Sequence, residues 1–267
     1  MTRPRITAPG LAARAAGLLA IGFLIAGCGP GSSSSSSGGP SSTPRVGSSS
    51  SPSSGKSTAA SGSGGTATSL FPATVGDTWV DRDTLGDHET GKSTNTITAV
   101  TPDSDGKKVT IAIRTENPGT GPTSTTVSYQ LYNNGSIGVP FSQFDNSTVT
   151  VKGGGIVWPP AAELATGQPH TSTLSVVVNS SATKLAVKAL VTVKGEGTQS
   201  VTVPAGTYSA TVISETISEK IEGIDAVTQV TTWVANGLGP VKSVVATKTG
   251  SVSVTDATDV LVSFKQG

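Results

Sequence analysis

The stretch Leu185-Ala186-Val187-Lys188-Ala189-Leu190-Val191-Thr192-Val193-Lys194 decides the fold class of this chain. Small and apolar side chains recur at every second residue, namely at Leu185, Val187, Ala189, Val191 and Val193. Lysine and threonine side chains stand between them. A period of two over branched apolar residues is the signal of a half-buried β-strand. The stretch therefore predicts a long strand of an antiparallel sheet.

The same alternation recurs around this stretch, at residues 109–113, 127–131, 230–234 and 260–264, where Val260, Val262 and Phe264 share one face. Turn-forming residues separate these segments, at 102–106, 117–119, 133–135 and 204–206. No segment carries a helical stripe, and only a single helical turn is expected, near Ala161–Ala165. Strands this long favour hairpins in a curved sheet, so we predict an all-β domain with antiparallel strands in a curved roll or open barrel.

Composition divides the chain of 267 residues into unlike parts. Hydrophobic residues make up 34% and charged residues 13%, which is less than in an average globular chain, so part of the chain is not globular. Five of the 18 basic residues precede Ser69, and all 17 acidic residues follow it, which leaves 13 bases against 17 acids and a net charge of −4 from Ser69 onward. A mildly acidic domain without a basic run is not expected to bind nucleic acid.

The N-terminus has the features of an export signal. Arg3, Arg5 and Arg14 precede an uncharged, mostly apolar run at 15–26, which ends in Gly27-Cys28. A basic segment, a short apolar segment and small residues at a cleavage point describe a secretory signal. The apolar run is too short to span a bilayer. We therefore assign residues 1–27 to a signal peptide.

The run Leu24-Ile25-Ala26-Gly27-Cys28 resembles the bacterial lipobox. The resemblance implies cleavage between Gly27 and Cys28 and transfer of a diacylglyceryl group to the Cys28 sulfur. Cys28 is the only cysteine, so it cannot form an internal disulfide; the alternative is a free cysteine that ends the signal by chance. Acyl chains at Cys28 would anchor the protein to the extracytoplasmic face of the cell membrane without spanning it.

Residues 28–68 consist almost wholly of Ser, Gly, Pro, Thr and Ala after the cysteine. Such a segment buries too little apolar surface to offset its chain entropy. We predict a disordered tether at 28–68 and one all-β extracytoplasmic domain at 69–267, present as a monomer.

Three motifs carry a family resemblance: Leu70–Trp79, Val201–Tyr208 with its Pro-Ala-Gly-Thr-Tyr sequence, and Thr231–Lys242. Together they resemble a group of bacterial exported proteins and lipoproteins, of actinobacterial type, over about Leu70–Thr249. Val80-Asp81 and Val234 depart from the aromatic residues usual in that group. The resemblance implies an all-β roll and carries no activity, cofactor or site residue with it.

Within these motifs, Pro204–Gly206 and Asn236–Pro240 predict tight turns between paired strands, because proline fixes φ and glycine tolerates positive φ. Trp79 and Trp233 are the largest apolar groups of a chain that has few aromatic residues, and we expect both in the core. The alternative for either is stacking on a ligand. Alternation along Val230–Val234 places Trp233 on the face opposite the two valines, as in a strand that is covered on both sides.

Acidic residues form two groups. The first comprises Asp77, Asp81, Asp83, Asp87, His88 and Glu89. We interpret it as a solvated loop, with a weak cation site as the alternative, since carboxylates are Ca²⁺ ligands; an EF-hand is excluded because Lys92 stands at its twelfth position. The second group is Glu215, Glu219 and Glu222 around Lys220, interpreted as a charged edge near a hairpin tip.

No catalytic residue, metal site or cofactor is predicted. His88 and His170 are the only histidines, and no nucleophile is paired with either. Ser181–Lys184 and Lys248–Gly250 match fragments of the penicillin-recognising signature, but Ser-x-x-Lys also occurs elsewhere in this serine-rich chain. The sequence favours a non-enzymatic binding or structural module of the cell envelope. The alternatives are a lipid or glycolipid carrier with an apolar cavity in the roll and, with less support, a hydrolase.

Overall fold

A computed structural model describes residues 69–119, 121–140, 149–152, 155–179, 184–221, 224–249 and 252–267. The expected signal peptide at 1–27, the Gly27–Cys28 cleavage and lipidation site and the expected tether at 28–68 lie outside these residues. In the part of the chain that is described, no helix is long and apolar enough to cross a membrane.

The described residues form thirteen strands. Their bounds are β1 Thr78–Leu85, β2 His88–Pro102, β3 Gly106–Glu116, β4 Thr123–Tyr132, β5 Ile137–Val139, β6 Val149–Lys152, β7 Ile156–Trp158, β8 His170–Asn179, β9 Lys184–Val203, β10 Gly206–Ile221, β11 Ile224–Ala235, β12 Gly239–Thr249 and β13 Val252–Lys265. The short helix α2, Ala161–Leu164, is the helical turn expected after Pro160.

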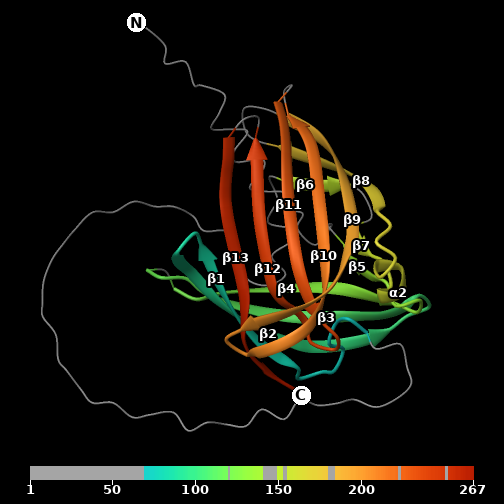
Figure 1. The fold of residues 1–267 in the computed structure, drawn as a ribbon, viewed down its shortest axis with the longest axis vertical. Helices are drawn as coiled ribbons and strands as arrows, with labels where there is room; N and C mark the ends of the chain where they lie inside the picture. Colours follow the sequence, from blue (N-terminus) through green and yellow to red (C-terminus); the bar gives the residue numbers. More distant parts are fainter. Residues whose placement is uncertain are drawn as a thin grey trace, which may run out of the picture. The chain divides into compact units, whose positions relative to one another are not determined.

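All thirteen strands belong to one antiparallel sheet, in the order β6-β8-β9-β10-β11-β12-β13-β1-β2-β3-β4-β5-β7. The order divides the sheet into a C-terminal half, which contains β6 and β8–β13, and an N-terminal half, which contains β1–β5 and β7. Figure 1 shows β10–β13 running side by side, with β2–β4 crossing them. The predicted fold class, antiparallel strands in a curved roll, is confirmed.

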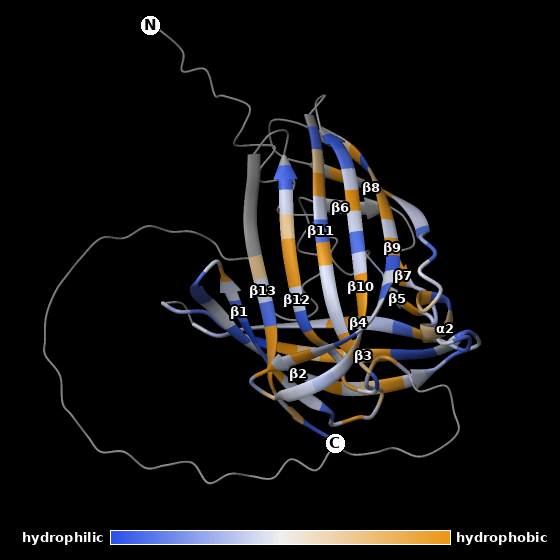
Figure 2. Ribbon diagram, viewed as in Figure 1, coloured by the Kyte–Doolittle hydropathy of each residue, from blue (hydrophilic) through white to orange (hydrophobic). Residues whose placement is uncertain are grey.

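The core lies between the two halves because both turn their apolar parity inward. Ile111 on β3 and Val191 on β9 are each at most 1% exposed and belong to one hydrophobic cluster. Figure 2 shows apolar and polar bands alternating along β10–β12, as the period of two predicts. The Phe71 ring packs edge-on against Tyr129 and Trp158, with ring centroids 5.3 and 5.4 Å apart.

The two tryptophans of the sequence motifs differ in position. Trp79 is buried in the core, as predicted. Trp233 lies on the opposite face from buried Val230 and Val234, also as predicted, but it is only half-buried where it packs against the core. Its indole nitrogen donates to the side-chain oxygen of Gln199 at 3.1 Å, and the Lys242 ammonium lies 4.9 Å from the ring centroid. The core expectation is therefore confirmed for Trp79 and only partly met by Trp233.

The predicted turns at Pro204–Gly206 and Asn236–Pro240 are confirmed. The second turn brings two motifs that are distant in sequence into contact. Pro204 and Ala205 connect β9 to β10, where Val203 pairs with Gly206. At the second turn the Gly239 amide donates to the Leu70 carbonyl at 3.0 Å. Gly239 has φ +86°, and a Cβ there would meet Pro72 at 3.2 Å. The first and third motifs thus pack on each other, which requires a glycine at this turn.

Candidate functional site

A stripe of buried polar side chains crosses the inner face of six neighbouring strands, from β11 to β3. Its members, called here the acidic stripe, are Thr232, Ser243, Asp259, Asp83, Asp81, Ser93, Thr115 and Asn95. Strand register brings them together, since Ser243 pairs with both Thr232 and Asp259, and Asp259 pairs with Asp83. On the next row Asp81 pairs with Ser93, which pairs with Thr115. Residues from distant parts of the chain therefore form one continuous feature.

The interpretation of residues 77–89 as a solvated loop is wrong for its first half. Asp77, Asp81 and Asp83 are each at most 3% exposed. Asp81 and Asp83 lie on β1 in the same parity as Trp79, and alternation turns all three side chains inward. Within the acidic group only Asp87, His88 and Glu89, around the β1–β2 turn, are exposed.

Burial dominates the electrostatics of the three carboxyls. It raises the pKa of Asp83 from 3.8 to about 7. Burial also raises the pKa of Asp81, and the neighbouring charge of Asp83 raises it further, although Asn95 opposes this by donating to the Asp81 carboxyl at 2.8 Å. Burial and then the charges of Asp81 and Asp83 raise the pKa of Asp259. The cluster therefore retains protons at a pH where surface aspartates have lost them.

Several oxygens of the stripe lack a hydrogen-bond partner within the described residues: both carboxyl oxygens of Asp83, one of Asp259, the Ser93 hydroxyl and the Asn95 side-chain oxygen. Because Asp83 and Asp259 lie directly opposite each other, a proton held by one carboxyl can bond to the other. Among these residues no group of three or more His, Cys, Asp or Glu side chains is placed to hold a metal ion. The stripe is thus suited to holding protons.

A second pair of acids lies inside the C-terminal half, which corrects the interpretation of Glu215 and Glu219 as a charged edge. Glu215 is 0% and Glu219 6% exposed, because both share the inward parity of Ile213 and Ile217. The Trp158 indole donates to Glu215. Burial raises the pKa of Glu215, a shift that Trp158 opposes, and burial raises that of Glu219 to about 7.

The other residues of that predicted edge lie elsewhere. Lys220 is exposed and pairs with Asp225 at 3.6 Å, and Glu222 is outside the described residues. Sequence alternation contained the missing signal for the buried pair, since Ile213, Glu215, Ile217 and Glu219 alternate with Ser214, Thr216, Ser218 and Lys220.

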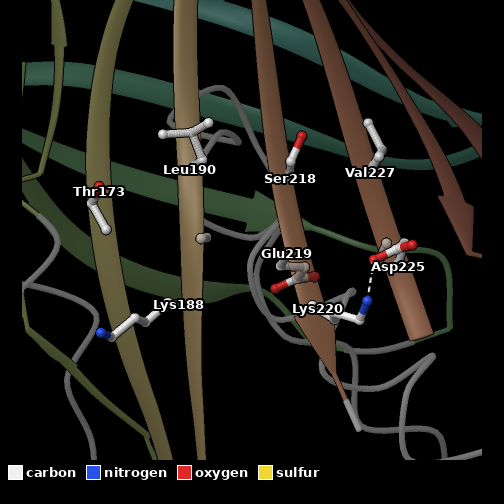
Figure 3. A pocket seen from close by; sticks show the side chains of 10 residues that line it. Thr173, Lys188, Leu190, Ser218, Glu219, Lys220, Asp225 and Val227 are labelled. Atoms are coloured by element: carbon white, nitrogen blue, oxygen red, sulfur yellow. Dashed lines mark ion pairs between the residues drawn. The ribbon is translucent and has the colours of Figure 1, made fainter. Parts of the chain in front are cut away.

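Strands β8–β11 carry an open hollow of about 450 Å³, called here the surface groove (Figure 3). It is lined by Thr173, Lys188, Ala189, Leu190, Ser218, Glu219, Lys220, Asp225, Ala226 and Val227. Leu190 is 48% exposed beside the charged rim formed by Lys188, Lys220 and Asp225. This mixture of an exposed apolar side chain and a charged rim suits an amphipathic partner.

The two histidines take no part in either feature. His88 is exposed at the start of β2. His170 begins β8, with its Nε2 atom 3.7 Å from the Glu163 carboxyl of α2. Neither lies on the acidic stripe or among the residues that line the surface groove.

Two solved structures are similar to this fold. A candidate lipoprotein from Parabacteroides distasonis is similar at a TM-score of 0.57 and 16% identity, over 74% of this chain and 99% of its own. A candidate exported protein with a YmcC-like fold from Bacteroides fragilis is similar at a TM-score of 0.53 and 16% identity, over 73% of this chain and 98% of its own. At these identities the similarity establishes the fold.

Among curated proteins, none matches the chain significantly. The DUF3108-like family matches residues 83–256, which contain most of the strands described above and well over half of the chain. The chain therefore belongs to the DUF3108-like family.

Proposed function

We propose that this protein is an exported lipoprotein of the cell envelope, anchored by acyl chains on Cys28, whose β domain is a non-enzymatic binding or structural module. The observation that carries the proposal is the run Leu24–Cys28 behind a basic and then apolar leader. The two similar structures support it, because one is described as a candidate lipoprotein and the other as a candidate exported protein. The sequence resemblance to an actinobacterial-type lipoprotein group points the same way.

An anchor at Cys28 would keep the β domain close to the membrane. Two acyl chains hold a protein stably on a membrane, whereas one chain is marginal. Residues 29–68 would link the anchor to the domain with a root-mean-square reach of roughly 35 Å, if they behave as a Ser/Gly coil. The domain would then work near the extracytoplasmic surface of the cell membrane.

The chemistry of the buried groups supports a non-enzymatic role. The acids of the stripe are only 2–5% exposed, so a substrate in solvent is out of the hydrogen-bond reach that a general acid or base needs. The surface groove supports a binding role, because Leu190 and Val227 offer apolar contact while Lys188 offers a positive charge. A lipid or glycolipid carrier gains less support, since the groove is open and carries charges.

Acyl labelling of the full-length protein tests the anchor. Cys28→Ala should abolish the label and either release the protein to the medium or leave an uncleaved precursor. Gly27→Ala is the matched control, because it keeps a small residue before the cleavage point and should retain the label. A cleaved, membrane-bound Cys28→Ala protein would contradict the proposal.

Comparative copurification tests the binding role. The full-length protein is isolated from native membranes, and bound molecules are identified by mass spectrometry. Leu190→Asp should reduce the amount of a specific partner, whereas Leu85→Asp should not, because Leu85 is equally exposed, at 46%, and lies on β1. Equal recovery with both variants would remove the surface groove from the proposal.

A further inference from the structure

The ladder between β1 and β13 has a special place in the sheet. In the strand order of the described residues it is the one ladder that joins the N-terminal half to the C-terminal half. It pairs residues Thr78–Leu85 with residues Ala257–Lys265. Loss of this pairing would break the backbone hydrogen-bond connection between the halves. In the described part of the chain they would then touch only through the shared core and the Trp158–Glu215 hydrogen bond, while each half kept its own internal ladders.

Like charges meet in the middle of that ladder. Asp83 on β1 lies directly opposite Asp259 on β13, and Asp81 lies two residues along β1 on the same inner face. The three side chains are 3%, 5% and 2% exposed, respectively. Like charges directly opposite each other in a sheet are destabilising, and burial enlarges the effect.

The strands around this cluster offer no compensating cation among the described residues. The inward groups from β2, β3 and β12 are Ser93, Asn95, Thr115 and Ser243, which are all neutral. Glu215 and Glu219, from β10, are the other buried acids of the C-terminal half, and no basic side chain is among the buried residues that the structure describes. The basic side chains nearest the cluster along these strands, Arg82, Lys92, Arg114 and Lys242, lie in the outward parity. The Arg82 Nε atom is buried there without a hydrogen-bond partner among the described residues.

We propose that the β1–β13 ladder is a proton-operated closure: it holds the two halves of the sheet together while the facing carboxyls share a proton, and it opens when they lose it. Asp83 and Asp259 are the switching groups, and Asp81 adds to the repulsion. The proposal concerns the fold itself and does not depend on the proposed lipid anchor.

The direction of the effect follows from the raised pKa of each carboxyl. An unfolded aspartate loses its proton near pH 4, whereas burial raises the pKa of folded Asp83 to about 7. Between these values the folded state binds more protons than the unfolded state, so stability falls as pH rises. The closure should therefore be tight in mild acid and loose in mild alkali.

Amide hydrogen exchange of the full chain, followed by mass spectrometry at about pH 5.5 and about pH 8.5, tests the proposal after correction for intrinsic exchange rates. Peptides from β1 and β13 should exchange at least ~10-fold faster at the higher pH. Peptides from the β3–β4 ladder are the control, because that ladder carries no buried acid among its described residues. After the correction their exchange rates should be the same at both pH values.

Asp83→Asn and Asp259→Asn, made singly, should abolish the selective change, and Asp225→Asn, at an exposed ion pair, should preserve it. If neither variant folds, the comparison of the two ladders in the unaltered protein still decides. Equal protection of β1 and β3 at both pH values would overturn the proposal. Restoration of protection in alkali by added Ca²⁺ would also overturn it, because the carboxyls would then act as cation ligands.

Discussion

Two buried acids in this sheet, Glu215 on β10 and Asp83 on β1, are both withdrawn from water but differ in what faces them. Glu215 receives a hydrogen bond from the Trp158 indole, which links β7 to β10 across the interior. Asp83 faces another acid, Asp259, which can donate to it only while that carboxyl holds a proton. Burial raises the pKa in both cases, so both acids make stability depend on pH, but only Glu215 also has a tryptophan donor that links two strands.

The largest effect is expected where a buried acid has a good partner. Trp158→Ala should lower the free energy of unfolding by about 3–5 kcal/mol, because it removes a buried ring and leaves Glu215 without its donor. Trp158→Phe keeps most of the ring and should cost about 1–3 kcal/mol, the price of an unsatisfied buried acceptor. Denaturant unfolding at one pH measures both. Equal losses for the two variants would show that the hydrogen bond to Glu215 contributes nothing.

A smaller effect of opposite sign is expected at Asp83. The free energy of unfolding of the unaltered protein should fall as pH rises from about 4 through 7, since folded Asp83 keeps its proton over this range. Asp83→Asn cannot ionise and can donate to Asp259, so it should gain about 1–3 kcal/mol at pH 8 and little at pH 4. Denaturant midpoints measured across this range check the slope. A variant that loses stability equally at both pH values would show that Asp83 acts through packing alone.

The smallest effect is expected at Glu219, a buried acid that faces neither a tryptophan donor nor a second acid among the described residues. Burial raises its pKa to about 7, but only one of its carboxyl oxygens is buried without a hydrogen-bond partner, whereas both oxygens of Asp83 are. Glu219→Gln should therefore gain about 1 kcal/mol or less at pH 8. The same titration as for Asp83 measures it. A gain as large as that of Asp83→Asn would mean that burial, and not the facing acid, sets the pH dependence.

Sequence reasoning predicted the strands and turns well because both have local causes. The alternation at Leu185–Lys194 and the turn at Pro204–Gly206 depend on residues that are neighbours in the chain, and the structure contains both. The single helical turn after Pro160 has a similar local origin.

The acidic stripe is not predicted from the sequence, because acidic side chains are expected to face solvent. On β13 the alternation predicts that Val260 and Val262 share one face of the strand. The buried side chains are instead those of Asp259 and Leu261, on the other face. A register shift between Val80 and Asp81 sets the pairing of Asp83 with Asp259, and no local pattern encodes it. By contrast, the burial of Asp81 and Asp83 can be predicted from the sequence. Both follow Trp79 at a period of two, and Trp79 is expected in the core.

The pairing of β1 with β13 also has a consequence for how the chain is made. Thr84 donates to the Thr258 carbonyl across a separation of 174 residues, so the first and last described strands must meet before the sheet is complete. During synthesis β13 emerges after every other described strand, and until then the two halves have no ladder between them. Folds that depend on such distant contacts form slowly. A growing chain of this kind stays open until its end is available, which is the state in which a polypeptide can still be threaded across a membrane.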